Sequence, residues 1–150
     1  MRFELLTSKN VGLYLEYLKQ ALLEDPEQMW INQIEEDKII NRLNDNFYQN
    51  TKSYLAIMNN KVVGRIEYHF YGCIQDGFKM AYVDWVYVLK EYRNKGIAKS
   101  LFSVFEQDCK DNGINQYFLI RATSESANHF YNSFKEVELE ESLTLRKNLD

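Results

Sequence analysis

The sequence has few residues that break or crosslink a chain: one Pro, six Gly and two Cys among 150 residues. Cys73 and Cys109 are far apart, with no Cys-x-x-Cys and no Cys/His cluster, so no metal site is expected. We interpret them as buried or half-buried free thiols in a reducing compartment. No stretch approaches the roughly 18 apolar residues of a membrane span, and the first residues lack a signal-like apolar segment. We therefore expect a cytoplasmic protein without membrane contacts.

An excess of positive charge is also missing, because 22 acidic residues outnumber 18 basic ones and the formal net charge is −4. A nucleic-acid partner is not expected, and the acidic balance weakly favours a cationic substrate. Low-complexity segments and linkers are absent as well. The chain is instead rich in residues that can form a core, with 45% hydrophobic residues, 11 Tyr and 9 Phe. This composition predicts a single domain over residues 1–150.

Hydrophobic periodicity predicts alternating helices and strands. Apolar residues three and four apart predict helices over residues 11–22, 34–43, 96–109 and 126–134. Strands are predicted at 3–6, 54–58, 62–68, 81–88 and 117–121, and the segments 137–139 and 143–145 alternate like a closing hairpin. This order predicts an α/β (α+β) fold with a mixed, mostly antiparallel sheet flanked by helices.

The strongest chemical signal is a strand that runs through a short polar turn into an amphipathic helix, at residues 84–101. The first N–H groups of a helix lack partners and its dipole is positive there, so such a turn can bind an anion. Gly96 and Ala98 would let a diphosphate approach the backbone, and Arg93 and Lys95 add positive charge. Neither Gly-x-x-x-x-Gly-Lys-Ser/Thr nor Gly-x-Gly-x-x-Gly is present. The alternative is a basic connection in which Gly96 only serves the turn.

Arg93-x-x-Gly96-x-Ala98 resembles the Gln/Arg-x-x-Gly-x-Gly/Ala signature of the GNAT superfamily of N-acetyltransferases. The resemblance covers most of the chain, although Leu89-Lys90 replaces the Pro that usually follows the preceding strand. It implies a GNAT-like fold and acetyl-CoA as co-substrate. Backbone groups of Val86 and Val88 would hold the pantetheine arm, and backbone amides of residues 93–99 would hold the pyrophosphate. The expected coenzyme-binding residues are Val86, Tyr87, Val88, Arg93, Asn94, Lys95, Gly96, Ile97, Ala98, Lys99 and Ser124.

A second segment, residues 124–131, resembles the family's Asn-x-x-Ala-x-x-Phe-Tyr. Ser124 stands where Asn is usual, so one coenzyme contact is expected to be shorter or lost. Lys135-Glu136 replaces the Gly-Phe that often follows. The resemblance places Tyr131 near the coenzyme sulfur and implies that it protonates the departing thiolate. The alternative is a buried aromatic residue that packs beside Phe130 and Phe134.

Asp84 is the candidate for receiving the amine, because it is a carboxylate within an apolar strand. Unpaired burial of a charge is costly, so it should lie in a cleft or have a partner, and burial would strengthen it as a base. Alternation predicts that it shares a face with Val86 and Val88 and contacts the amine directly or through water. The alternative is a structural partner of Arg65. Glu67 is the reserve candidate, with a solvated edge position as its expected place.

His69 and His129 lack metal-ligand spacing and receive no role. The sequence thus predicts an enzyme that transfers an acetyl group from acetyl-CoA to a primary amine by direct attack. The acceptor would be a small molecule (a polyamine, an aminoglycoside-like molecule or an amino acid) or a protein N-terminus. The alternative is a coenzyme A-binding regulatory module without activity. Exposed C-terminal edge strands would also favour a homodimer.

Overall fold

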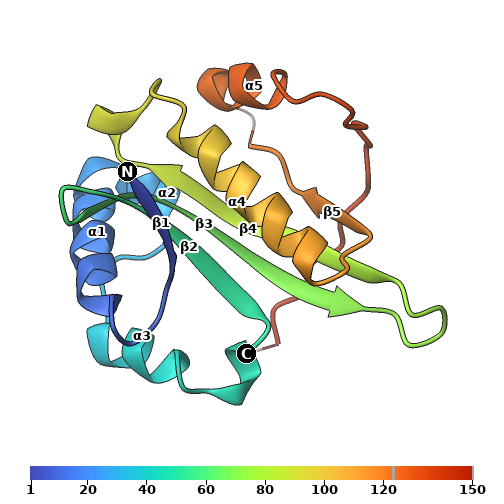
Figure 1. The fold of residues 1–150 in the computed structure, drawn as a ribbon, viewed down its shortest axis with the longest axis horizontal. Helices are drawn as coiled ribbons and strands as arrows, with labels where there is room; N and C mark the ends of the chain where they lie inside the picture. The colour runs from blue at the N-terminus through green and yellow to red at the C-terminus, as the bar shows by residue number, and fades with distance from the viewer. Residues whose placement is uncertain (123, 150) are drawn as a thin grey trace. The chain divides into compact units, whose positions relative to one another are not determined.

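The computed structural model describes residues 1–122 and 124–149 and divides the chain into two compact units, Met1–Ile120 and Arg121–Asp150. The first unit holds a five-stranded sheet in the order β1-β2-β3-β4-β5 (Figure 1). The strands are β1 (Arg2–Leu5), β2 (Thr51–Met58), β3 (Lys61–Gly72), β4 (Lys79–Val88) and β5 (Gln116–Leu119). The first four are antiparallel neighbours, and β5 is parallel to β4. The predicted mixed, mostly antiparallel sheet is confirmed.

Two long helices, α1 (Val11–Glu24) and α4 (Ile97–Asp111), cover opposite faces of this sheet. The side chain of Arg65 on β3 lies 5.4 Å from the ring of Tyr14 in α1. Tyr68, an odd number of residues away on the same strand, instead packs against Phe105 of α4, with 4.6 Å between the ring centres. Figure 1 shows α4 lying over β3 and β4. Shorter helices join these elements: α2 (Pro26–Met29), α3 (Glu36–Arg42), η1 (Asn46–Tyr48) and η2 (Lys90–Tyr92).

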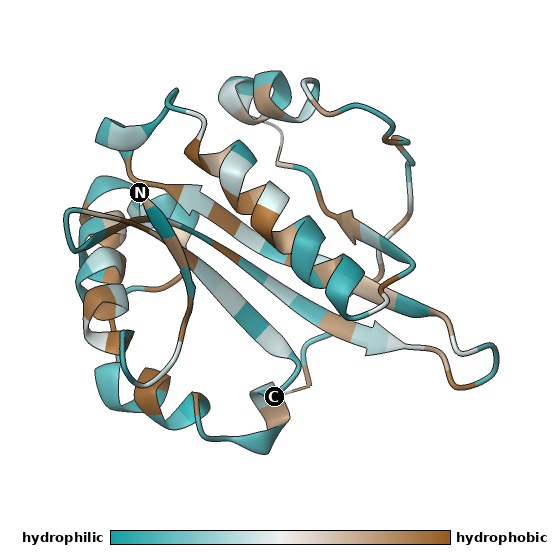
Figure 2. Ribbon diagram, viewed as in Figure 1, coloured by the Kyte–Doolittle hydropathy of each residue, from teal (hydrophilic) through white to brown (hydrophobic). Residues whose placement is uncertain are grey.

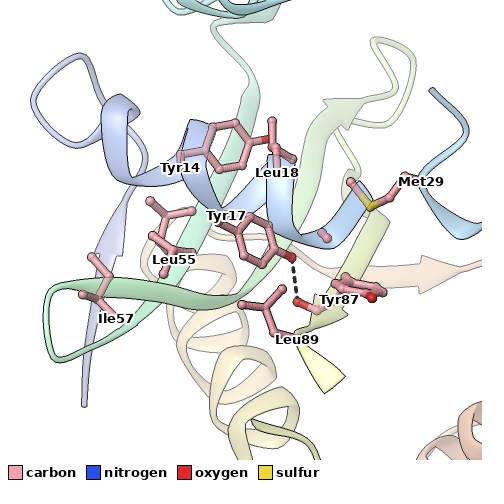
Figure 3. Packing of buried hydrophobic residues seen from close by; sticks show 10 residues of the cluster. Tyr14, Tyr17, Leu18, Met29, Leu55, Ile57, Tyr87 and Leu89 are labelled. Carbon is pink, nitrogen blue, oxygen red and sulfur yellow. Dashed lines mark hydrogen bonds between the residues drawn. The ribbon is translucent and has the colours of Figure 1, made fainter. Parts of the chain in front are cut away.

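The core holds β4 in place between these helices. On one face, Tyr14, Tyr17 and Leu18 of α1 pack against residues of β2 and β4, including Leu55 and Tyr87 (Figure 3). The buried Tyr17 hydroxyl donates to the Tyr87 carbonyl at 2.9 Å, which avoids the cost of an unpaired polar group. On the other face, apolar residues of α4 recur at helical spacing, as the alternating colours of Figure 2 show. The buried members are Ile97, Leu101, Phe102, Phe105 and Cys109.

Some boundaries differ from the sequence prediction. α3 begins directly at the acidic run of residues 35–37, where negative side chains suit a helix N-terminus. β3 continues to Gly72, beyond the predicted end at residue 68, which leaves a loop of residues 73–78 before β4. Cys109 is buried and Cys73 is exposed, both as free thiols, so the expectation of burial holds for only one of them. Within the described ranges, no helix is long and apolar enough to cross a membrane.

The predicted closing hairpin is wrong. In the second unit, the helix α5 (Glu125–Tyr131) is followed by residues 132–149 without any strand. The alternating apolar residues of this segment are exposed: Val137, Leu139, Leu143 and Leu145. A hairpin needs turn residues such as Gly, Asn, Asp or Pro, whereas Glu140-Glu141-Ser142 stand at the expected turn. Alternation alone therefore does not produce a strand here, and the argument for a dimer through C-terminal strands loses its basis.

Candidate active site

A β-bulge interrupts β4 at Asp84. Its neighbours Val83 and Trp85 pair with successive residues of β3, so Asp84 has no residue opposite it. A bulge of this kind bends the strand and redirects side chains that would otherwise alternate. It occurs where the pairing of β4 with β5 ends, because the last parallel pair joins Val83 to Leu119. The bulge and the end of this pairing coincide at one point of the sheet.

Beyond the bulge, the backbone of β4 is open on the side away from β3. The N–H of Leu89 donates to the carbonyl of Val63 on β3 at 2.9 Å, so alternation directs the backbone groups of Val86 and Val88 away from β3. The Val88 carbonyl accepts a hydrogen bond from Arg93 Nε at 2.9 Å, in agreement with this direction. No strand among residues 1–122 and 124–149 pairs with this edge at residues 84–88. An extended ligand with amide groups could bind here as a strand does.

The N-terminus of α4 is a second opening, formed by backbone alone. Gly96 is the N-cap residue, with φ of 77°, in the left-handed region that favours glycine. The first helical bond runs from the Ser100 N–H to the Gly96 carbonyl, which leaves the N–H groups of Ile97, Ala98 and Lys99 without helical partners. A Cβ at Gly96 would meet no heavy atom within 4 Å. Open space therefore lies next to N–H groups that can bind an anion.

The basic side chains of this turn contact nearby residues. Arg93 Nη2 lies 3.7 Å from Asp25 Oδ2, and its Nε is engaged by Val88 as described above. Lys95 Nζ donates to the carbonyl of Glu91 at 3.1 Å. Asn94 has a positive φ of 60° and is exposed, so it shapes the turn without adding charge. The candidate anion site is therefore made of backbone amides, with the cationic side chains at its margin.

The predicted face of Asp84 is wrong, and its alternative role as the partner of Arg65 is not found either. Its side chain is 47% exposed, so it is not buried without a partner. Its Oδ2 lies 3.5 Å from His69 Nε2, on the face that α1 covers, whereas Val86 pairs with Ile66 on the face of α4. It also does not pair with Arg65, which donates to Glu67 at 2.8 Å. The bulge explains the change of face, because an extra residue reverses the alternation on which the prediction depended. The role of Asp84 toward the amine stays a prediction.

Glu67 lies on a central strand and is partly buried, so the solvated edge position expected for it is wrong. Its Oε2 accepts hydrogen bonds from Ser53 Oγ at 2.7 Å and from Arg65 Nη1 at 2.8 Å. Burial opposes the charge of Arg65, but Tyr14, Glu67 and Tyr17 together raise the pKa of this guanidinium above its ordinary value. Glu67 is therefore the anion of a partly buried ion pair, which leaves Asp84 as the accessible carboxylate at the bulge.

His69, to which the sequence assigned no role, lies beside Asp84. Its Nδ1 lies 2.9 Å from Thr51 Oγ1, and its ring stacks on Tyr82 at 6.2 Å between ring centres. Its side chain is 35% exposed. No sequence pattern links residues 51, 69 and 84, because their proximity depends on the register of three strands and on the bulge. Among the described residues, no group of three or more His, Cys, Asp or Glu side chains could hold a metal ion.

The second unit contains Tyr131, the candidate acid. Its ring lies 5.2 Å from that of Phe130 and 6.0 Å from that of Phe134, and the Arg121 guanidinium carbon is 6.0 Å from its centre. Burial raises the pKa of the Tyr131 hydroxyl, and Arg121 opposes this shift. The hydroxyl thus keeps its proton near neutral pH, as a general acid requires. Aromatic packing, the alternative for this residue, is confirmed, and it does not conflict with such a role.

Ser124 has a local structural task at the start of α5. Its hydroxyl accepts a hydrogen bond from the Ala127 N–H at 3.3 Å and caps the helix. The expected contact of this side chain with the coenzyme stays a prediction, and the capping bond uses one of its acceptor positions.

The sequence profile of the acetyltransferase (GNAT) family matches residues 14–135. The chain belongs to the GNAT family. It is therefore an acetyl-CoA-dependent N-acetyltransferase, and the matched range includes both openings of the first unit as well as Tyr131. The curated proteins contain no match to this chain.

Solved structures of similar fold agree with this assignment. An aminoglycoside acetyltransferase from an uncultured soil metagenomic sample, in complex with trehalose, has a TM-score of 0.83 and 19% identity over 99% of this chain and 96% of its own. The ribosomal-protein-alanine N-acetyltransferase of Brucella melitensis biovar Abortus 2308 has a TM-score of 0.76 and 18% identity, covering 97% and 99% of the two chains. The aminoglycoside N-acetyltransferase AAC(6')-Iy in complex with CoA has a TM-score of 0.68 and 12% identity, covering 98% and 99%. At these identities the likeness concerns the fold.

Proposed function

We propose that this acetyltransferase modifies a primary amine of a small cationic molecule or a protein N-terminus by direct attack of the amine. The observation that supports this most is the combination of an open β4 edge at residues 84–88 with an uncapped helix N-terminus that begins at Gly96. One strand thus leads from a backbone edge suited to an extended amide-bearing arm directly to a site suited to a diphosphate. Acetyl-CoA carries both groups in this order.

The residues present fit acetyl-CoA. The backbone groups of Val86 and Val88 would bind the pantetheine arm, with Tyr87 between them, and Gly96 leaves open space beside the free N–H groups of residues 97–99. Arg93, Asn94 and Lys95 shape the turn that leads to this site. When bound, acetyl-CoA supplies the activated acetyl group as a thioester. The residues of this chain would bind and orient the two substrates and transfer the protons.

Two side chains have proposed chemical roles. Tyr131 Oη would hold the proton that the departing coenzyme sulfur needs, because burial keeps this hydroxyl protonated. Asp84 would attract and orient the ammonium form of the acceptor, directly or through water, because its carboxylate is accessible at the bulge. A cationic acceptor also agrees with the formal net charge of −4.

The solved relatives suggest which acceptors to test. One structure of the soil-sample aminoglycoside acetyltransferase contains sisomicin, a small molecule, and another relative is named for ribosomal-protein alanine. We therefore propose a panel of sisomicin, spermidine, lysine and a peptide that begins with alanine. Thiol release from acetyl-CoA, with mass analysis of each product, measures acetylation. Turnover with one class of amine supports the proposal and names the acceptor class.

The alternative is a regulatory module that binds coenzyme A without catalysis. It predicts calorimetric binding of acetyl-CoA but no thiol release with any amine of the panel, and this outcome would overturn the proposed reaction. We further propose that residues 1–150 act as one acetyltransferase domain, since the family match extends from residue 14 to residue 135 across both units. A homodimer also stays a prediction, which light scattering on the purified chain can test.

A further inference from the structure

Thr51, His69 and Asp84 form a row of polar side chains across β2, β3 and β4. Thr51 Oγ1 lies 2.9 Å from His69 Nδ1, and His69 Nε2 lies 3.5 Å from Asp84 Oδ2. We propose that His69 Nε2 accepts the proton that the acceptor amine must lose, while Asp84 binds the ammonium and Thr51 fixes the imidazole. This inference rests on the acetyl transfer proposed above and adds the proton acceptor to it.

Either tautomer of the ring fits its two partners, and proton acceptance at Nε2 requires the one that carries its proton on Nδ1. When Nδ1–H donates to Thr51 Oγ1, the other nitrogen, Nε2, presents a lone pair next to the Asp84 carboxylate. The 3.5 Å between Nε2 and Oδ2 exceeds a normal hydrogen bond. In this tautomer, His69 Nε2 and Asp84 Oδ2 are both hydrogen-bond acceptors. A single ammonium nitrogen placed next to them can donate to both. The pair is thus complementary to a primary ammonium.

The location of the pair suits an acceptor site. The side chains of His69 and Asp84 are 35% and 47% exposed, so a ligand can reach them. The ring of Tyr82 stacks on His69, and the half-exposed ring of Phe118 lies 5.0 Å from that of Tyr82. Aromatic faces attract cations. Asp84 also follows Val83, the last residue of β4 that pairs with β5, so the pair lies where the open edge of β4 begins.

The proton transfer balances. An N–H bond of the ammonium breaks, a bond from the proton to His69 Nε2 forms, and the freed lone pair of the amine attacks the acetyl carbon. The Asp84 carboxylate then stabilises the imidazolium, and solvent can take the proton from the exposed ring. An imidazole is a better proton acceptor than a carboxylate near neutral pH. Asp84 would thus bind the ammonium, and His69 would act as the base.

The charged neighbours of His69 support this assignment. Asp84 faces it from β4, and Thr51 faces it from β2 with an uncharged hydroxyl. Glu67 lies two residues away on the same face of β3, but it is already engaged by Arg65. Asp84 is therefore the carboxylate that acts directly on the ring.

Kinetics of matched variants test the proposal, with acetyl-CoA and the panel amine that the wild type turns over fastest. His69→Gln should lower kcat/KM at pH 7 on the order of a hundredfold, with recovery at high pH, where the amine is already neutral. Thr51→Val should lower it less, and Thr51→Ser, which keeps the hydroxyl, should resemble the wild type. His129→Gln serves as the control for the other histidine. All variants should keep the acetyl-CoA affinity and melting temperature of the wild type.

Nitrogen-15 NMR of the imidazoles gives a readout that does not need turnover. The chain has two histidines, so His69→Gln assigns the signals. The proposal expects a neutral Nδ1–H tautomer at His69 in the wild type and in Thr51→Ser, and a tautomer mixture in Thr51→Val. An Nε2–H tautomer in the wild type, or superimposable pH–rate profiles for His69→Gln and wild type, would overturn it while acetylation persists. Absence of acetylation by the wild type with every amine would instead overturn the proposed function and this inference together.

Discussion

Arg65 Nη1 lies 2.8 Å from Glu67 Oε2, on the face of the sheet that α1 covers. The Arg65 side chain is 9% exposed and the Glu67 side chain 25% exposed, and Ser53 supplies a further hydrogen bond to the same carboxylate oxygen. Buried ion pairs add little net stability, but removal of one partner leaves the other charge uncompensated. The pair therefore belongs to the framework that holds β3 against α1, next to the residues proposed for catalysis.

Glu67→Gln and Asp84→Asn should accordingly behave in opposite ways. Glu67→Gln leaves Arg65 without its anion and should lower the free energy of unfolding by about 2–3 kcal/mol. Asp84→Asn changes an exposed side chain and should leave stability within about 0.5 kcal/mol of the wild type. Its rate per folded molecule should fall, mainly through a higher KM for the amine, and recover partly at high pH. Urea unfolding and pH–rate profiles on the same preparations measure both effects.

The result that would contradict the role of Asp84 is a wild-type pH–rate profile in a folded Asp84→Asn enzyme. If this variant instead melts much earlier while its rate per folded molecule is unchanged, Asp84 is a structural residue. Equal stability of Glu67→Gln and wild type would show that the Arg65–Glu67 pair is dispensable.

Gly96 offers a test of the anion site with a matched control. Any side chain at Gly96 strains the backbone at φ of 77°, and a large one also fills the open space before α4. Gly113, near the other end of α4, has φ of 66° and a similarly open surrounding. Gly96→Trp and Gly113→Trp should thus lose similar stability, about 1–2 kcal/mol each. Only Gly96→Trp should also lose acetyl-CoA affinity, by at least about tenfold in calorimetry.

Equal acetyl-CoA affinity in the two glycine variants would remove the argument for a pyrophosphate site at this helix. A loss of affinity in both would show that folding strain, rather than blocked space, controls binding.

The sequence predicted the parts of the site that depend on local backbone chemistry. The turn before α4 could be found because Gly96 and the helical spacing from Ile97 onward are adjacent in the chain. The strands β2 and β3 could be found because a short polar turn separates their apolar segments, and Asn59 and Asn60 of this turn both have positive φ in the structure. The family resemblance assigned these elements to a GNAT acetyltransferase, and the family match confirms the family.

What the sequence could not predict depends on strand register. One extra residue in β4 moves Asp84 to the face of His69, and no local pattern marks this bulge. The partner of Arg65 was missed for a similar reason, since Glu67 on the same strand and Asp84 on the next strand are equally plausible from spacing alone. The prediction for the C-terminal segment was wrong for a different reason. Its alternating apolar residues indicated two strands, but no suitable turn joins them.

Buried tyrosines should make the protein lose stability at alkaline pH. Burial raises the pKa of Tyr87 to about 12, above the ordinary value of 10.0. The folded state therefore keeps a proton that the unfolded state loses, so this stability is complete below about pH 10 and declines as pH rises toward 12. Tyr87→Phe should flatten the decline of the urea midpoint between pH 9 and pH 11, with little change at pH 8. Tyr71→Phe, which alters an exposed tyrosine, should retain the wild-type decline.

Tyr131→Phe tests the acid role directly. The substitution keeps the ring that packs with Phe130 and Phe134 and removes only the hydroxyl, so stability and acetyl-CoA affinity should stay near wild type. Without the proton for the departing thiolate, kcat should fall on the order of a hundredfold or more. The control is Phe134→Leu, which disturbs the same aromatic cluster but leaves the hydroxyl. It should lower the melting temperature while the rate per folded molecule changes much less. An undiminished kcat in Tyr131→Phe would assign the proton to water or to another donor.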